Sequence, residues 1–350
     1  MTSAGRLVAA RRSLRCDRCG LSAYPADDRI GLDGFLSPGA ARMACLAAAS
    51  WSFGVAADRL EEFCGVRIDD ETIRRHVHRE AEALGRRRES APPAAAFARA
   101  EGDDLEVLID GVYAPARGGY REVKMALFQA RPRGEAATPA GWADRQLPGP
   151  SASAAYASTA DCDAFAATWR PRAEGLGIDP DGPLTVLADG ASWIWRTTGE
   201  QFEGGDGVLD IFHASQHIAT AANALHGEGT AEAADWLDGG RARLLADGWP
   251  GLMDHVGATP ADGLTAAGRA ALDEMIAYFA AHTGRLGYFG RLRQGRSIGS
   301  GAVEGLARRL GRRLKIPGRG WEAGNLDGMA TLILTADSAG WADLWSRPAA

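Results

Sequence analysis

Several features that define other protein classes are missing from this sequence of 350 residues. No uninterrupted apolar stretch reaches the length of about 18 residues that a transmembrane helix needs. Neither GxGxxG nor GxxxxGK followed by Ser or Thr occurs, so the sequence supports neither a nucleotide-fuelled helper protein nor a dehydrogenase. The five cysteines are few and odd in number, which predicts thiols or metal ligands rather than disulfides.

Lysine is also scarce, because Lys124 and Lys315 are the only two among 39 basic residues. Arginine is therefore abundant everywhere, and only its clustering carries information. Arginines near the start of the chain occupy positions where a secretory signal needs an apolar core. The sequence thus predicts a cytoplasmic protein without a membrane partner.

The composition is that of a globular protein, with 46% hydrophobic and 24% charged residues. The net charge of −6 argues against a nucleic-acid partner when it is averaged over the chain. Residues 285–319 contradict that average, since they contain ten basic side chains and one acid, Glu304. Such a run can be a solvated face, but this nearly pure positive charge can also neutralise several phosphates.

The N-terminal part divides into three predicted regions. Residues 1–36 form a basic segment with Cys16 and Cys19 in a CxxC pattern, half of a zinc site that needs two further ligands. Residues 37–90 are predicted to be helical and resemble a helix-turn-helix DNA-binding region, although ordinary helical hairpins share this pattern. The Ala- and Pro-rich residues 91–103 are predicted to be a linker.

From residue 104 onward the sequence pattern changes from helical to the combination of strands and helices that is typical of an α/β domain. Two apolar runs predict a hairpin whose turn lies in YAPARGG, and the loop 132–155 leads to a helix around residues 161–175. Two further strands are predicted, in PLTVLADGASWIW and in GVLDIF, with Trp193 and Trp195 alternating across the first of them. From about residue 214 to residue 290 the pattern is helical.

Two Asp-Gly dipeptides stand apart from the others in the chain. Asp110 and Asp189 each follow an apolar run, so each carboxylate is expected at the end of a buried strand. A strand holds such a group rigidly, as a preorganised site requires. Both dipeptides can instead be simple turns, which Asp-Gly favours.

Glu304 is the third candidate acid, at the start of a predicted helix after Gly299-Ser300-Gly301. Three carboxylates from two strands and a helix can bind two Mg²⁺ or Mn²⁺ ions, which prefer oxygen ligands. Two such ions cut phosphodiesters by activating water and stabilising the leaving oxygen. Glu304 can alternatively pair with Arg308 one helical turn later.

The elements LIDGVYAP, REVKMALF, VLADGASWIW, LDIFHASQHI and the block from GSGAVEGLARR to GWADLW occur in this order. Together they resemble the DDE transposases of bacterial insertion sequences, specifically the ISKra-type family. The likeness covers residues 104–350, and residues 30–77 are similar to that family's N-terminal region. It implies an RNase H-like catalytic domain over residues 104–350, with a helical insertion at about 214–290.

The resemblance also implies roles for individual residues. Asp110, Asp189 and Glu304 match the three metal-binding acids. Asp210 and His213 match an Asp-x-x-His element, in which we expect the histidine to support the site through a hydrogen bond. A small metal site of Asp210, His213 and His217 is the alternative, because His at i and i+4 share a helix face.

The implied activity is cleavage at the element ends followed by strand transfer into target DNA. The partners would be double-stranded DNA, both terminal inverted repeats and target, and further copies of the chain in a homodimer or larger complex. Residues expected to contact phosphates are Arg121, Lys124, Arg308, Arg309, Arg312, Arg313 and Lys315. A domesticated, non-catalytic DNA-binding protein and a glycoside hydrolase with two carboxylates remain alternatives.

Overall fold

The computed structural model describes residues 1–8, 10–30, 32, 36–90, 97–260, 264–316, 320–336, 338 and 340–345. Its strands are β1 (Leu14–Arg15), β2 (Ser22–Ala23), β3 (Asp104–Ala116), β4 (Gly119–Arg131), β5 (Ala152–Ser158), β6 (Leu184–Ala188) and β7 (Gly205–Leu209). Its helices are α1 (Pro25–Ile30), α2 (Pro38–Ser50), α3 (Phe53–Cys64), α4 (Asp70–Ser90), α5 (Cys162–Ala166), α6 (Trp169–Gly175), α7 (Ser192–Gln201), α8 (Ile211–His226), α9 (Ala231–Gly257), α10 (Ala266–Ala280), the 3₁₀ helix η1 (Thr283–Arg285), α11 (Tyr288–Arg293), α12 (Gly301–Leu314), α13 (Ala323–Ala336) and α14 (Gly340–Trp345).

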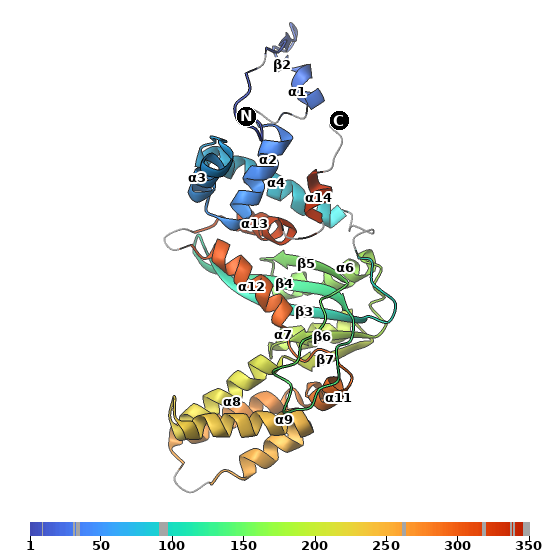
Figure 1. Ribbon diagram of the computed structural model, residues 1–350, viewed down its shortest axis with the longest axis vertical. Coiled ribbons are helices and arrows are strands. Elements are labelled where there is room, and N and C mark those ends of the chain that lie inside the picture. The colour runs from blue at the N-terminus through green and yellow to red at the C-terminus, as the bar shows by residue number, and fades with distance from the viewer. Residues whose placement is uncertain are drawn as a thin grey trace.

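A five-stranded mixed sheet lies in the middle of the molecule (Figure 1). The strand order is β5-β4-β3-β6-β7, in which β3, β4 and β5 are antiparallel and β6 and β7 run parallel to β3. The apolar runs predicted as strands therefore form one sheet, and the predicted α/β class is confirmed. β6 is buried along its whole length, whereas only the last two residues of the edge strand β7 are buried.

The hairpin of β3 and β4 is longer than the sequence predicted. β3 continues through Asp110 to Ala116, and the chain turns at Gly118, whose φ of 86° favours glycine. The prediction that Asp110 ends a strand is therefore wrong. A Cβ at Gly111 would lie 2.5 Å from Glu122 Oε1 on the neighbouring strand, so a larger residue there would displace the Glu122 carboxylate.

Two other local predictions need correction. The predicted loop 132–155 contains the start of β5, a strand rich in Ala and Ser that lacks the β-branched residues used to recognise strands. Trp193 and Trp195 do not alternate across a strand, because β6 ends at Ala188 and both tryptophans lie on α7. Pairing with β4 forms β5, although its local sequence favours no strand.

Helices cover the two faces of the sheet differently. On one face α12 packs across β3, and α13 packs against β5 (Figure 1). The other face carries an aromatic cluster, in which Phe128 of β4 contacts Phe202 edge to face and Phe202 stacks on Trp169 of α6 at 6.1 Å. This cluster anchors β4 against α6 and the end of α7.

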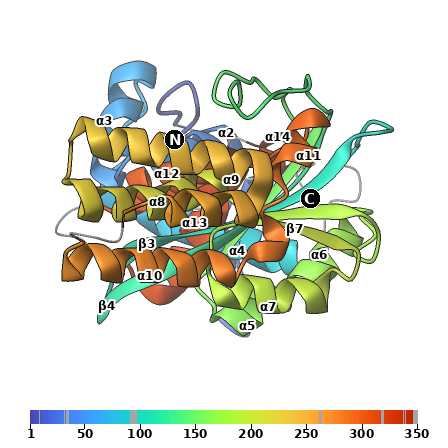
Figure 2. The same cartoon turned by 90° about the horizontal axis from the view of Figure 1, so that it is seen from below.

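Two helical groups lie at opposite ends of the sheet. The predicted helical residues 37–90 fold as α2, α3 and α4, and α2 and α4 pack against the distant α13 (Figure 1). Asp69 caps α4, with Thr72 N donating to Asp69 Oδ1 at 2.8 Å. At the other end α8, α9 and α10 form the predicted helical segment around 214–290 (Figure 2).

The proposed linker is described only in part. Residues 97–103 contain neither helix nor strand, and residues 91–96 of the predicted linker lie outside the described residues. In the part of the chain that the structure describes, no helix combines the length and apolar character needed to cross a bilayer.

Candidate functional site

Two predicted acids lie next to each other near the centre of the sheet. The parallel register pairs Leu108 of β3 with Leu187 of β6. Continuing both strands by two residues brings Asp110 beside Asp189, which follows the last residue of β6. Residues in register on neighbouring parallel strands share a face of the sheet, so the two carboxylates belong to one face.

The third predicted acid comes from the helix that crosses this face. Glu304 lies in the first turn of α12, and its N–H donates to Ser300 O at 3.2 Å. Its Oε1 is buried and has no hydrogen-bond partner among the described residues. Among the described residues, Glu304 forms no ion pair with Arg308. An unpaired buried carboxylate oxygen is costly and indicates a missing cation or donor.

Electrostatic coupling links the predicted residues. Burial, the largest cause, and the negative charges of Asp189 and Glu304 together raise the pKa of Asp110 to about 6. The backbone N–H of Gly111 donates to Asp110 Oδ1 at 2.7 Å and, with the charge of His213, opposes this shift. The four ionisable groups therefore act on one another, and a cation among them would relieve the repulsion between the carboxylates.

Asp210 joins two helices at the strand–helix junction after β7. It is fully buried, and Oδ1 accepts from His213 N at 2.8 Å and from the His213 ring at 3.2 Å. Oδ2 accepts from Ser300 N at 2.5 Å and from Ser300 Oγ at 2.8 Å. Burial raises the pKa of Asp210, but these hydrogen bonds outweigh it and hold the pKa below its ordinary value. Asp210 thus fixes the start of α8 and the start of α12 together.

His213 is the residue that connects this junction to the acids. Its hydrogen bond to Asp210 raises its pKa against the effect of burial, and the charges of Asp210, Asp189 and Asp110 add to the rise. Asp210, His213 and Glu304 each offer a ligand atom within 4.8 Å of the others, and this group, found among the described residues, includes neither Asp110 nor Asp189. His217 is not part of it, because its ring stacks on Tyr278 at 3.6 Å. The predicted hydrogen-bonding role of His213 agrees with this geometry.

The sequence analysis missed Tyr278 of α10, whose ring covers the backbone beside Asp189. A Cβ at Gly190 would lie 2.2 Å from Tyr278 Cε2. Burial raises the pKa of Tyr278, and the charges of Asp189 and Asp210 add to this. Trp195 Nε1 donates to Asp189 O at 2.8 Å from the other side. The helical insertion therefore helps to hold the acid after β6, and the Asp-Gly dipeptide was its only sequence signal.

Replacing Gly190 with Ala is expected to lower the free energy of unfolding by about 1–3 kcal/mol, because the new methyl overlaps the Tyr278 ring and the packed α10 must shift. Urea denaturation measures the change. Gly199→Ala is the matched control, since this exposed helical glycine has open space around it and the alanine should add about 0.5–1 kcal/mol. Wild-type stability in Gly190→Ala would contradict the close packing.

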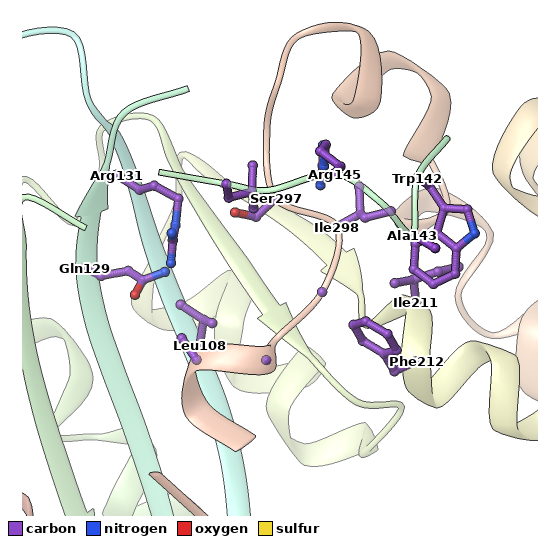
Figure 3. Close-up of a pocket in the computed structure, with 14 residues that line it drawn as sticks. Leu108, Gln129, Arg131, Trp142, Ala143, Arg145, Ile211, Phe212, Ser297 and Ile298 are labelled. Atoms are coloured by element: carbon purple, nitrogen blue, oxygen red, sulfur yellow. The ribbon is translucent and has the colours of Figure 1, made fainter. Parts of the chain in front are cut away.

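A pocket of about 270 Å³ adjoins the start of α12 on the same sheet face. Figure 3 shows Gln129 of β4 and Leu108 of β3 on one side of it, and Trp142 and Phe212 on the other. The last two rings lie 5.6 Å apart. The walls come from separate segments of the chain, so no local pattern indicated this pocket.

Burial corrects two of the predicted phosphate contacts. Lys124 is 5% exposed, and its Nζ donates to Ala160 O at 3.0 Å and pairs with Glu122 at 3.1 Å. Arg313 is 3% exposed, and its Nε donates to Ala48 O at 2.6 Å. Both side chains bind protein groups instead of pointing into solvent. The exposed members of the predicted set are Arg121, Arg308, Arg312 and Lys315, and Arg309 is partly buried.

Other arginines of the basic segment also serve the fold. Arg291 is 6% exposed, pairs with Asp206 at 2.8 Å and donates to Ser297 O at 2.7 Å. Burial lowers the pKa of Arg291 to about 10. Arg296 pairs with Asp104 at 3.1 Å. The arginines of this segment therefore differ in role. Arg291 and Arg296 form ion pairs within the fold, whereas Arg308 and Arg312 are exposed on the helix that carries Glu304.

Cys16 and Cys19 lie in the turn between β1 and β2 and are both exposed. Gly20 N donates to Cys16 O at 2.8 Å, which closes the turn. Within the described ranges, no other His, Cys, Asp or Glu completes a group of three ligands with them. Zinc binding by this pair stays a prediction.

Comparison with known protein families found no family model that matches this chain, and comparison with curated proteins found no similar sequence.

Proposed function

We propose that this protein is a DDE-type DNA transposase with an RNase H-like catalytic domain. The observation that carries the proposal is the electrostatic coupling of Asp110 to both Asp189 and Glu304, beside the sheet register that leads to Asp110 and Asp189 on neighbouring strands. The strand order β5-β4-β3-β6-β7 with three antiparallel and two parallel strands supports the RNase H-like assignment. The reaction would be cleavage at the ends of an insertion sequence and transfer of the 3′ ends into target DNA.

The side chains present fit two Mg²⁺ or Mn²⁺ ions. Carboxylate oxygens are the ligands that these cations prefer, and Glu304 Oε1 has no other partner within the described residues. Asp110, Asp189 and Glu304 would hold the ions, which supply activation of water or a 3′-hydroxyl and stabilisation of the leaving oxygen. Asp210 accepts four hydrogen bonds from His213 and Ser300, so its role would be to hold α8 and α12 in place.

The substrate DNA would lie along the exposed side of α12. Arg308 and Arg312 are four residues apart and both exposed, so they follow one face of the helix that carries Glu304. Lys315 and Arg121 add positive charge near the end of this helix and on the β3–β4 hairpin. Two DNA ends must be processed together, which would require a homodimer or larger complex.

Incubation of the protein with Mg²⁺ and DNA from both flanks of its gene tests the function directly. We expect nicks at defined positions that mark the element ends, mapped by primer extension. Omission of the metal should abolish them, since the carboxylates alone do not activate water for this reaction. Nicking without any positional preference, or no nicking with intact acids, would contradict the proposal.

The proposed phosphate contacts can be tested separately, through the salt dependence of the DNA-binding constant. The double substitution of Arg308 and Arg312 with Gln should lower the slope of log K against log salt concentration by about 1 for each lost phosphate contact. Fluorescence anisotropy of duplex DNA at several salt concentrations measures this slope. Arg269→Gln, on an exposed face of α10, removes equal charge per site and should leave the slope unchanged. An unchanged slope in the double variant would remove α12 from the DNA interface.

A further inference from the structure

A second pocket, of about 420 Å³, lies between the N-terminal helices and the chain that follows α12. We call it the Trp321 pocket. Its wall combines cationic, aromatic and polar side chains from four segments that are distant in the sequence. They are Ser52, Phe53, Arg74, His78, Arg117, Arg313, Ile316, Gly320, Trp321, Glu322 and Asn325.

The aromatic part of this pocket is rigidly built. Trp321 N donates to Pro115 O at 2.9 Å, and Trp321 Nε1 donates to Leu314 O at 3.0 Å. Its ring lies 6.4 Å from the Phe53 ring, edge to face, and 6.3 Å from His78. The tryptophan is therefore fixed both by its backbone and by its side chain, and it offers a preformed apolar surface.

The electrostatic part is positive. The buried guanidinium of Arg313 lies between the Phe53 and Trp321 rings, 5.0 and 5.1 Å from their centroids. Arg74 and Arg117 reach the pocket from α4 and from the β3–β4 turn; Arg74 pairs with Glu71 at 2.6 Å, and Arg117 pairs with Glu322 of the pocket wall at 2.8 Å. Burial lowers the pKa of His78, and the charges of Arg74 and Arg313 lower it further. A ligand that brings negative charge into the pocket would offset this concentration of positive charge.

Aromatic rings beside cationic groups are the combination that binds single-stranded nucleic acid, because bases stack on rings and phosphates pair with arginines. The volume of 420 Å³ is within the range of small-ligand pockets and is large enough for one nucleotide. A peptide side chain would use either the rings or the charges. A nucleotide uses both, since its base and its phosphate are joined.

We propose that the Trp321 pocket binds one unpaired nucleotide of DNA, with the base against Trp321 and the phosphate beside Arg74. This inference rests on the proposed function for the identity of the nucleic acid. Arg313 follows Glu304 by nine residues along α12, a separation of about 14 Å at the rise of an α-helix. The bound nucleotide would therefore lie about four phosphates from the cleaved bond, at 3.4 Å for each phosphate of one strand.

Fluorescence anisotropy without added divalent metal tests the pocket with labelled d(T)10 and with an abasic deoxyribose-phosphate chain of the same length. Trp321→Leu should weaken d(T)10 binding about tenfold and leave abasic binding unchanged, because stacking alone is lost. Arg74→Gln should weaken both ligands by a similar factor, since both carry phosphates. Arg74 is partly exposed, and among the described residues its ion pair is with Glu71 on its own helix, so this variant should fold normally.

Matched controls are available on the same molecule. Arg86→Gln removes an arginine that is also ion-paired within α4 but lies outside the pocket. Trp249→Leu removes a partly buried tryptophan of the helical insertion. Both should bind d(T)10 like the wild type. Thermal unfolding of every variant reports whether the fold is intact.

The proposal is overturned if Arg74→Gln binds d(T)10 as tightly as Arg86→Gln does, or if Trp321→Leu weakens abasic and d(T)10 binding equally. Tighter binding of r(U)10 than of d(T)10 would assign the pocket to RNA and overturn the DNA partner. None of these measurements requires cleavage. A protein that fails the nicking assay can therefore still show the predicted binding of d(T)10. Conversely, a negative binding result overturns the pocket and does not affect the proposal for the catalytic acids.

Discussion

Substitution of Asp110 by Asn should reduce Mg²⁺-dependent nicking of the flanking DNA by about 10³-fold or more, because a neutral amide cannot hold a cation at the cleaved phosphate. Asp189→Asn and Glu304→Gln should reduce nicking by a similar factor, since each removes one carboxylate ligand of the same proposed metal site. Denaturing gels of labelled DNA measure nicking. Binding of the same DNA should persist or tighten slightly, because each variant removes a negative charge beside the polyanion.

Glu174→Gln is the matched control for these variants. Glu174 is exposed on α6 and forms only a long ion pair of 3.9 Å with Arg170, so its loss should change neither nicking nor binding. Robust nicking by any one of the three acid variants would contradict the proposed catalytic set. If all three variants lose DNA binding and unfold at a lower temperature than the wild type, the three acids stabilise the fold and are not catalytic.

Substitution of Asp210 by Ala should lower the free energy of unfolding by about 3 kcal/mol, because a helix cap is lost and the buried N–H of Ser300 is left without its acceptor. Nicking should fall as well, since the first turn of α12 no longer holds Glu304 in place. Urea denaturation gives the stability change, and nicking at low temperature, where the variant stays folded, gives the effect on activity.

Asp161→Ala separates the helix cap from the junction. Asp161 also caps a helix, accepting from Ala164 N at 2.8 Å, but it is exposed and reaches no second element. Its loss should cost about 1 kcal/mol and leave nicking unchanged. If Asp210→Ala is no more destabilising than Asp161→Ala, then Asp210 does not tie α8 to α12.

Much of the local structure could be predicted because it depends on neighbouring residues in the chain. The apolar run before Asp189 predicted β6, and the helical pattern of residues 37–90 predicted α2, α3 and α4. β5 could not be predicted in this way. Its Ala- and Ser-rich sequence favours no strand, and its hydrogen bonds to β4 come from residues about thirty positions earlier.

The candidate acids were recognisable because chemistry and context coincided. Asp189 directly follows a buried apolar run, and Glu304 is the one acid in a segment of arginines. Each residue conflicts with its local sequence pattern, and such conflicts are expected at functional sites. Asp110 was selected for a partly wrong reason, since it lies within β3 and not at its end. Tyr278 and Ser300 gave no signal, because what they do depends on groups that only the fold brings near.

The sequence by itself determined the α/β character of the chain, the helical segments on either side of the sheet and the concentration of positive charge around one glutamate. Only the tertiary structure decided which of those charges face solvent. Arg308 and Arg312 remain exposed, whereas Arg291 and Arg313 are buried against acceptors distant in the sequence. The physical reason is that helix and strand patterns arise from adjacent residues. Burial and electrostatic coupling depend on every group that the fold brings within a few ångströms.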